Sequence, residues 1–198
     1  MKLIIASGNQ GKLREIRAIL GEKFDEILSM KEAGIHHETV EDGKTFMENA
    51  YKKAYEIAQL SGCPALADDS GICVEALGGE PGIYSARYCG RHGDDEANNR
   101  LLIKNLQGVE NRRAYYACAV ALVYPDTVKN KKREGNAIFA EGYLEGTIID
   151  EPRGNGGFGY DPYFFLEEYG KTAAEITAEE KNKISHRAKA LQALLEKL

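Results

Sequence analysis

Two adjacent carboxylates, Asp68 and Asp69, follow the short apolar run 65–67 and precede Ser70 and Gly71. Neighbouring anions repel each other, and keeping both ionised in a partly dry site is costly unless a cation lies against one of them. The pair therefore predicts a bound metal ion. Because consecutive side chains of a strand point to opposite faces, we expect one carboxylate to bind the ion and the other to support it. An acidic turn that closes a strand is the alternative.

A candidate phosphate loop lies between the expected strand 2–6 and the helix that follows it. Glycines there let backbone amides point outward, and the helix N-terminus offers positive potential to an anion. Lys12 in the first turn opposes the helix dipole, which hints that a phosphate offsets the repulsion. The segment does not match the eight-residue loop that ends in Gly-Lys-Ser/Thr, and an ordinary strand-to-helix turn is the alternative. The residues concerned are Ser7, Gly8, Asn9, Gln10, Gly11 and Lys12.

Further carboxylates could complete the metal site. Glu38, Glu41 and Asp42 precede an expected helix, and one of them could join Asp69 around Mg²⁺, which prefers oxygen ligands, retained waters and substrate phosphates. Taken singly, each is typical of a solvated loop. The histidine pair at 36–37 lacks other nitrogen or sulfur ligands in its segment, so we interpret it as a surface feature.

A glycine-rich loop, 154–161, places four glycines around one aromatic residue ahead of one acid. Such backbone can approach a ligand closely, and Phe158 would present a ring on which a nucleobase stacks, a contact worth roughly 1 to 3 kcal/mol. Backbone amides nearby could read the edge of that base. The alternative is a structural loop pinned by Phe158 and Tyr160.

The last candidate group consists of Lys181, His186 and Arg187. At about 100° per residue, Lys181 and His186 lie about 140° apart on one continuous helix and could not converge. We therefore predict that a short helix over 178–184 ends there and that Ser185 caps a new helix. His186 and Arg187 would then lie in a first turn, from which they could reach an anion or a carbonyl oxygen. A polar helix start without a ligand is the alternative.

Hydrophobic spacing and turn residues predict strands and helices in alternation. Strand, helix and strand in this order imply a right-handed crossover and some parallel pairing. We expect an α/β fold with a mixed central sheet flanked by helices. The expected strands are 2–6, 64–67, 72–76, 113–124 and 136–144, of which 72–76 is either a new strand or the continuation of 64–67. The expected helices are 10–20, 45–61, 94–106 and the C-terminal segment.

Some details of these helices and loops can be predicted as well. Thr45 and Glu48 indicate a capping box at the second helix. A polar hairpin loop over 125–135 would carry the basic run 131–133. The third helix is expected to bury Ala97, Leu101 and either Ile103 or Leu106, and the C-terminal helix Ala188, Leu191, Leu194, Leu195 and Leu198.

Length and composition limit the class of protein. With 198 residues, 43% hydrophobic and 29% charged, the chain predicts one globular domain over 1–198 with two lobes. Its 26 basic and 31 acidic residues argue against a nucleic acid partner. The apolar run 3–6 is far too short for a signal peptide or a membrane span, so we expect a cytoplasmic protein with no membrane partner. The widely spaced cysteines predict free thiols; they are Cys63, Cys73, Cys89 and Cys118.

Taken together, six segments in this order resemble the family of non-canonical purine nucleoside triphosphate pyrophosphatases, also called inosine or xanthosine triphosphate pyrophosphatases or the Ham1 family. The match runs through nearly the whole chain. Its segments are Ser7 to Lys12, Thr45 to Ala50, Ala67 to Gly71, Pro81 to Tyr88, Gly156 to Pro162 and Ser185 to Arg187.

This resemblance implies a two-lobed α/β fold with the active site in the cleft between the lobes, usually a homodimer, using Mg²⁺. It implies hydrolysis of ITP, dITP and XTP to the monophosphate and pyrophosphate, which removes deaminated purines from the nucleotide pool. Asp69 would be the general base and a metal ligand, Glu41 a second metal ligand and Asp68 a supporting acid. The implied substrate-binding residues are Ser7, Gly8, Asn9, Gln10, Gly11, Lys12, Lys53, Ser70, Phe158, Gly159, Tyr160, Asp161, Lys181, His186 and Arg187.

The chemistry of the residues agrees with this resemblance. Hypoxanthine offers a 6-oxo acceptor where adenine carries an amino donor, so a donor aimed at that atom favours hypoxanthine. The candidate donors are Lys181, His186, Arg187 and the loop amides. Two other functions stay open: a nucleotide sensor without catalysis, and a hydrolase of altered pyrimidine or methylated nucleotides on a related fold.

Overall fold

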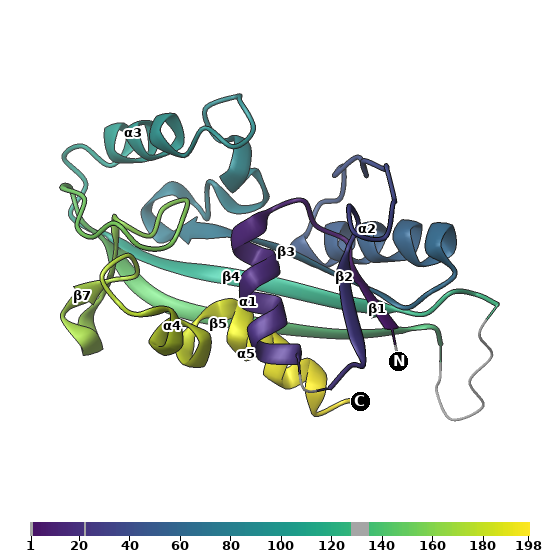
Figure 1. The fold of residues 1–198 in the computed structure, drawn as a ribbon. Helices are drawn as coiled ribbons and strands as arrows, with labels where there is room; N and C mark the ends of the chain where they lie inside the picture. Colours follow the sequence, from purple (N-terminus) through teal and green to yellow (C-terminus); the bar gives the residue numbers. More distant parts are fainter. Residues whose placement is uncertain (1, 22, 128–134) are drawn as a thin grey trace. The chain divides into compact units, whose positions relative to one another are not determined.

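The computed structural model describes residues 2–21, 23–127 and 135–198. In these residues one sheet has the strand order β2-β1-β3-β4-β5-β6-β7 (Figure 1). β1 pairs in parallel with β2 and β3, whereas β6 pairs antiparallel with β5 and β7. This is the mixed α/β sheet that the sequence predicted. The strands are β1 Lys2–Ile5, β2 Glu26–Ser29, β3 Ala65–Val74, β4 Arg113–Val123, β5 Ala137–Ile148, β6 Phe164–Leu166 and β7 Lys171–Thr172.

The chain forms two compact units, and the long strands contribute to both. Unit 1 comprises Met1–Asp69, Cys118–Gly142 and Arg187–Leu198, and unit 2 comprises Ser70–Ala117 and Tyr143–His186. The expectation of one domain in two lobes with a cleft stays a prediction.

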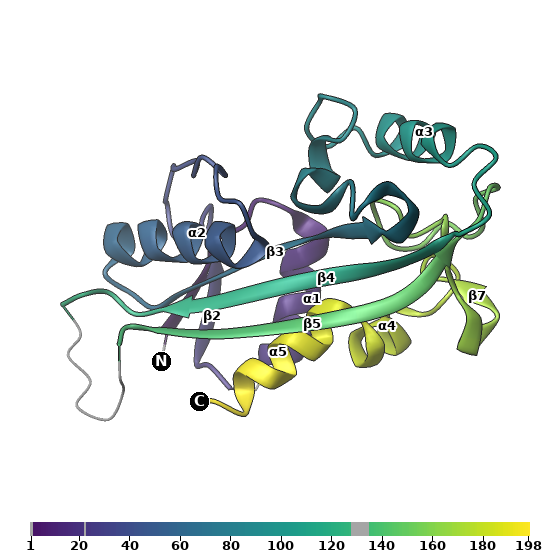
Figure 2. The same ribbon diagram turned by 180° about the vertical axis from the view of Figure 1, so that it is seen from behind.

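Unit 1 has three layers. Helices α1 (Gln10–Leu20) and α5 (His186–Leu195) pack on one face of the sheet, and α2 (Phe46–Ser61) packs on the other (Figures 1 and 2). Alternation along the strands assigns side chains to these faces: Leu3 belongs to the α1 and α5 side and Ile4 to the α2 side. Both faces of the sheet are thereby buried, so any polar group that this part of the sheet carries needs a partner.

Unit 2 has a core of its own, in which segments of β3, β4 and β5 pack with α3 (Asp95–Asn105) and the region around β6 and β7. It also contains α4 (Ala178–Ile184) and the short 3-10 helices Glu75–Leu77, Gly82–Arg87 and Glu167–Tyr169. Its buried residues include Ile72, Val74, Leu102, Leu106, Tyr116, Leu144, Phe164 and Leu166.

The predicted break near the C-terminus is confirmed. Helix α4 ends at Ile184, Ser185 adopts an extended conformation, and α5 begins at His186. Of the predicted capping box, Thr45 Oγ1 accepts a hydrogen bond from the Glu48 amide at 3.1 Å, but the Glu48 carboxylate accepts from Lys44 N instead of Thr45 N.

Other expectations about elements were wrong. The strand predicted over 64–67 does not end before the paired carboxylates, because β3 continues without interruption to Val74, so that 72–74 is its continuation and not a new strand. The buried face of α3 carries Asn98, Asn99 and Leu102 in place of Ala97 and Leu101. In the C-terminal segment Leu198 is exposed, whereas Ala190, which was not expected in the core, is buried. The basic run 131–133 lies outside the described residues.

Two further observations concern the whole of the described chain. All four cysteines fall within the described residues and are free thiols, as predicted. Among the helices of these residues, none is both long enough and apolar enough to cross a membrane.

Candidate active site

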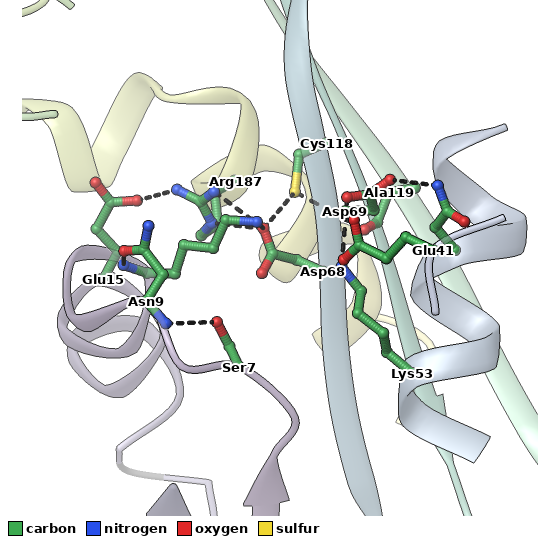
Figure 3. A network of polar contacts seen from close by, with 12 residues as sticks. Ser7, Asn9, Glu15, Glu41, Lys53, Asp68, Asp69, Cys118, Ala119 and Arg187 are labelled. Carbon is green, nitrogen blue, oxygen red and sulfur yellow. Dashed lines mark hydrogen bonds and ion pairs between the residues drawn. The ribbon is translucent and has the colours of Figure 1, made fainter. Parts of the chain in front are cut away.

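The paired carboxylates point to opposite faces of β3 (Figure 3). Leu66 faces α1 and α5 while Ala65 and Ala67 face α2, and the same alternation continues through the acids. Asp68 therefore lies on the α1 and α5 side, and Asp69 on the α2 side. The expectation that the two carboxylates would face different partners is confirmed by their contacts.

Asp68 is 1% exposed and belongs to a buried charge cluster. Its Oδ2 accepts from Arg187 Nε at 3.1 Å and Nη2 at 3.0 Å, and lies 3.0 Å from Lys12 Nζ. The same guanidinium also pairs with Glu15 on α1. Burial opposes ionisation of Asp68, but attraction by Lys12 and Arg187 outweighs it and holds the pKa of this carboxyl well below its usual range.

Asp69 has a different environment. Its Oδ2 accepts from Asn49 Nδ2 at 3.1 Å, and its Oδ1 lies 3.3 Å from Lys53 Nζ, which also donates to Glu41 Oε1 at 2.6 Å. Burial raises the pKa of Asp69 above its usual value, since the nearby lysines offset the burial only in part. Asp69 is thus the member of the pair that the protein environment makes more basic.

The carboxylates of Glu41 and Asp69 share one ammonium group, that of Lys53. A positive charge between two carboxylates marks a position that also suits a divalent cation. Oxygen ligands from two carboxylates, completed by waters and substrate phosphate, match the coordination that Mg²⁺ prefers. Asp42 instead pairs with Lys52, so Glu41 is the acid of its loop that lies beside Asp69. Within the described residues no group of three or more His, Cys, Asp or Glu side chains is arranged to hold a metal.

The candidate phosphate loop adopts a capped helix start. Asn9 is the N-cap of α1, and its side-chain oxygen accepts from Lys12 N at 3.1 Å, while Asn9 N donates to Ser7 Oγ at 3.2 Å. The first turn of α1 therefore begins at Gln10, with Lys12 Nζ directed to Asp68. Gly8 is exposed. The ion pair with Asp68 places Lys12 in the same polar network as Arg187, which also contacts Asp68.

The glycine-rich loop is organised around Asp161, which is 2% exposed. Asp161 Oδ2 accepts from Lys181 Nζ at 2.6 Å and from Phe158 N at 2.9 Å, and Oδ1 accepts from Tyr116 OH at 3.3 Å. The Lys181 ammonium lies 4.7 Å from the centre of the Phe158 ring. A Cβ added at Gly157 would lie 2.0 Å from Asp161 Oδ2, so only glycine admits this carboxylate.

The structure separates the C-terminal basic residues. Lys181 joins Asp161, and the His186 ring stacks on Tyr116 with centroids 4.6 Å apart and an interplanar angle of 11°. Arg187, in contrast, is 1% exposed and contacts Asp68 and Glu15. The expectation that Arg187 donates to the base with Lys181 and His186 does not agree with these contacts.

The predicted site residues thus fall into two groups. The first group belongs to unit 1, and its members share polar contacts or adjoin residues that do. It consists of the segment Ser7 to Lys12, Glu41, Lys53, Asp68, Asp69 and Arg187. In unit 2, the loop Phe158 to Asp161, Lys181 and His186 form a second group, with Ser70 half-exposed on β3. Residues that the sequence reasoning did not select are Asn49, Tyr116, Asp95 and Asn99. Of these, Asn49 stood in a segment already singled out, Thr45 to Ala50, and its place one helical turn before Lys53 was a usable signal.

Comparison with known proteins decides the family of this chain. A sequence profile of the Ham1 family matches residues 3–197. The chain belongs to the Ham1 family. A dITP/XTP pyrophosphatase of Nitrosomonas europaea is 49% identical over 197 residues, covering 100% of this chain and 94% of that protein. Another, from Geobacter sulfurreducens, is 49% identical over 199 residues, covering 100% and 96%.

Solved structures of Ham1 proteins agree with the fold. The Ham1 protein of Staphylococcus aureus superposes with a TM-score of 0.84 at 39% identity, covering 100% of this chain and 99% of its own. A Ham1 protein from Coxiella burnetii gives a TM-score of 0.86 at 35% identity, with 100% of both chains covered. The α/β architecture with its mixed sheet is therefore that of the Ham1 family.

Proposed function

We propose that this protein hydrolyses dITP, ITP and XTP to the nucleoside monophosphate and pyrophosphate, and so removes deaminated purines from the nucleotide pool. The similar proteins named dITP/XTP pyrophosphatases support this over the full length of the chain. The observation that carries the proposal is that the two adjacent carboxylates of β3, Asp68 and Asp69, have different surroundings. One carboxylate is neutralised by Lys12 and Arg187, and its neighbour stays basic beside Glu41 and Lys53.

In the proposed reaction Asp69 accepts a proton from water as the water oxygen bonds to phosphorus. The attacked atom is the α-phosphorus. Its bond to the oxygen that bridges to the β-phosphate breaks, and pyrophosphate leaves with that oxygen and the electron pair of the broken bond. Asn49 Nδ2 orients the Asp69 carboxylate for this task.

Glu41 and Asp69 would hold Mg²⁺, and the bound ion would supply charge neutralisation for the phosphates. The cationic residues of this chain add to that effect. Lys53 already bridges the two carboxylates, and Lys12 stands at the first turn of α1, where helix amides also attract an anion. We assign phosphate binding to Lys53 and to the segment Ser7 to Lys12.

We assign binding of the nucleobase to the loop Phe158 to Asp161 of unit 2. Phe158 would stack on the purine, and the Lys181 ammonium beside its ring would donate to the 6-oxo atom of hypoxanthine or xanthine. The buried carboxylate of Asp161 fixes Lys181 and the Phe158 amide at once. His186, stacked on Tyr116, is the second candidate donor. Adenine carries a donor at the same position and would be disfavoured.

Several predictions from the resemblance are kept as part of the proposal. Ser70 is assigned to substrate contact and Tyr160 to support of the base loop. Because its guanidinium is engaged by Asp68 and Glu15, we assign Arg187 as a positioning residue for Asp68 instead of a base contact. A homodimer in the cytoplasm is also proposed, and light scattering after size-exclusion chromatography tests the dimer.

Pyrophosphate release with Mg²⁺ present tests the function over dITP, ITP, XTP, dGTP, dATP and modified pyrimidine triphosphates. We expect pyrophosphate from the first three, little from dGTP or dATP, and release about 10²- to 10⁴-fold slower from the first three with Asp69→Asn. Release of inorganic phosphate in place of pyrophosphate would contradict the proposal. Preference for a modified pyrimidine would favour the related hydrolase, and binding without any product would favour a sensor.

A further inference from the structure

We propose that helix α3 is the positioning element of the base-binding loop, and that Asp95 and Asn99 set the place of Phe158 by holding Gly159. This inference rests on the proposed function, because it concerns the loop to which the purine is assigned. Neither residue is part of that proposed site. Both act through the backbone of Gly159 and are positioning residues.

Gly159 is held at both of its backbone polar groups. Its amide donates to Asp95 Oδ2 at 2.9 Å, and its carbonyl accepts from Asn99 Nδ2 at 2.9 Å. Asp95 and Asn99 are four residues apart on α3, so their side chains lie on one face, one helical turn from each other. One face of α3 therefore hydrogen-bonds both the amide and the carbonyl of Gly159, and we call Asp95 and Asn99 the clamp. The Gly159 amide is therefore engaged by Asp95 in this structure.

The buried face of α3 is partly polar. Beside Leu102 it carries two asparagines, Asn98 at 1% and Asn99 at 7% exposure, at positions where a helix that only packs would carry apolar residues. Asn98 Oδ1 accepts from Cys89 N at 2.8 Å. In the described part of the chain, Asn99 Oδ1 is buried without a hydrogen-bond partner. The other end of this buried amide, Nδ2, makes its hydrogen bond to the Gly159 carbonyl, so the contact with the loop is what the Asn99 side chain provides here.

The clamp is placed next to the stacking residue. Phe158 precedes Gly159, and its own amide is fixed by Asp161. On the other side of Gly159, Tyr160 OH donates to Ser85 O at 2.7 Å. Phe158 is thus anchored within the loop, Gly159 to α3 and Tyr160 to the 3-10 helix Gly82–Arg87, so α3 supplies the central anchor. Without it the Phe158 ring would sample several positions, and stacking would have to order it at a cost in affinity.

Kinetics of pyrophosphate release from dITP test this inference in Asp95→Ala, Asn99→Ala and Asp95→Asn. Glu96→Ala is the matched control, because Glu96 is also an acid in the first turn of α3 but pairs with Arg100. We expect each alanine variant of the clamp to raise KM about three- to tenfold, as the loss of one hydrogen bond predicts, with kcat within about twofold. Asp95→Asn retains an acceptor and should restore KM, and Glu96→Ala should match the unsubstituted protein.

A residue with only a structural role would lower kcat by reducing the folded fraction and leave KM unchanged. Amide hydrogen exchange of the peptide 154–161 gives a second measurement, which needs no substrate, and it should accelerate in Asp95→Ala but not in Glu96→Ala. Equal KM and equal exchange in Asp95→Ala and Glu96→Ala would overturn the inference, even if Asn99→Ala fails to fold. If the unsubstituted protein releases no pyrophosphate from dITP, the proposed function fails, and the exchange experiment alone decides whether α3 holds the loop.

Discussion

Neutralising either carboxylate of the pair on β3 should have opposite consequences, although Asp68→Asn and Asp69→Asn are the same chemical change at adjacent positions. Asp68 is buried against three nitrogen atoms of two cations, at 3.0 to 3.1 Å. Removing one partner of a buried ion pair leaves the other charge uncompensated and costs about 3 to 5 kcal/mol. We expect Asp68→Asn to lower the free energy of unfolding by about that amount, a large part of the roughly 5 to 15 kcal/mol of a typical domain.

For Asp69 the expected change in the free energy of unfolding is different. Its pKa in the folded protein lies above the usual value because of burial, so folding already disfavours its ionised form. Asp69→Asn should therefore leave the free energy of unfolding unchanged or slightly higher. Loss of a general base lowers kcat by about 10² to 10⁴, and we expect a fall of this size. The folded fraction of Asp68→Asn should keep a larger part of its kcat, because Asp68 contacts cations and no reacting atom.

Urea unfolding followed by circular dichroism gives the free energies, and pyrophosphate release from saturating dITP and Mg²⁺, divided by the folded fraction, gives kcat. For Asp68 the ionised form is the stabilising one, because its pKa in the folded protein is lowered. The stability that ionised Asp68 contributes is therefore fully present above the pKa that this carboxyl has in the unfolded chain. It is lost as the pH falls through the lower pKa of the folded protein. The reasoning is refuted if Asp69→Asn unfolds as easily as Asp68→Asn, or if Asp68→Asn is fully stable and inactive.

Three further predictions concern the remaining site residues. Phe158→Ala should raise KM for dITP about five- to 150-fold, the equivalent of 1 to 3 kcal/mol of stacking, while Phe158→Tyr retains most of the affinity; an unchanged KM in steady-state assays would exclude stacking. Glu41→Gln should raise the Mg²⁺ concentration needed for half-maximal rate, and chelation of divalent ions should stop turnover of the unsubstituted protein; an unaltered Mg²⁺ titration would remove Glu41 from the metal site. Gly157→Ala should destabilise the loop and raise KM, because the new Cβ would lie 2.0 Å from Asp161 Oδ2, and wild-type hydrogen exchange over 154–161 would contradict this.

Much of the local structure was predictable because it depends on short-range rules. The break at Ser185 was predicted from helical geometry together with the premise that Lys181 and His186 belong to one site, since a continuous helix would point them in different directions. The opposite orientation of Asp68 and Asp69 followed from the pleat of a strand. The end of β3 was misjudged, because two acids are unfavourable in a strand unless distant cations neutralise them, and such cations have no local signature.

The sequence by itself determined which residue types could do chemistry, where the helices begin, and which family the motifs resemble. Only the tertiary structure decided how those residues are paired. Arg187 lies 119 residues from Asp68 and was expected to contact the nucleobase. Packing of α5 instead brings its guanidinium to the buried Asp68 carboxylate. Asn99 lies 60 residues from Gly159, and no periodicity announces that contact. The physical reason is that propensity and periodicity act over a few residues, whereas the pairing of buried charges and amides depends on which elements pack together.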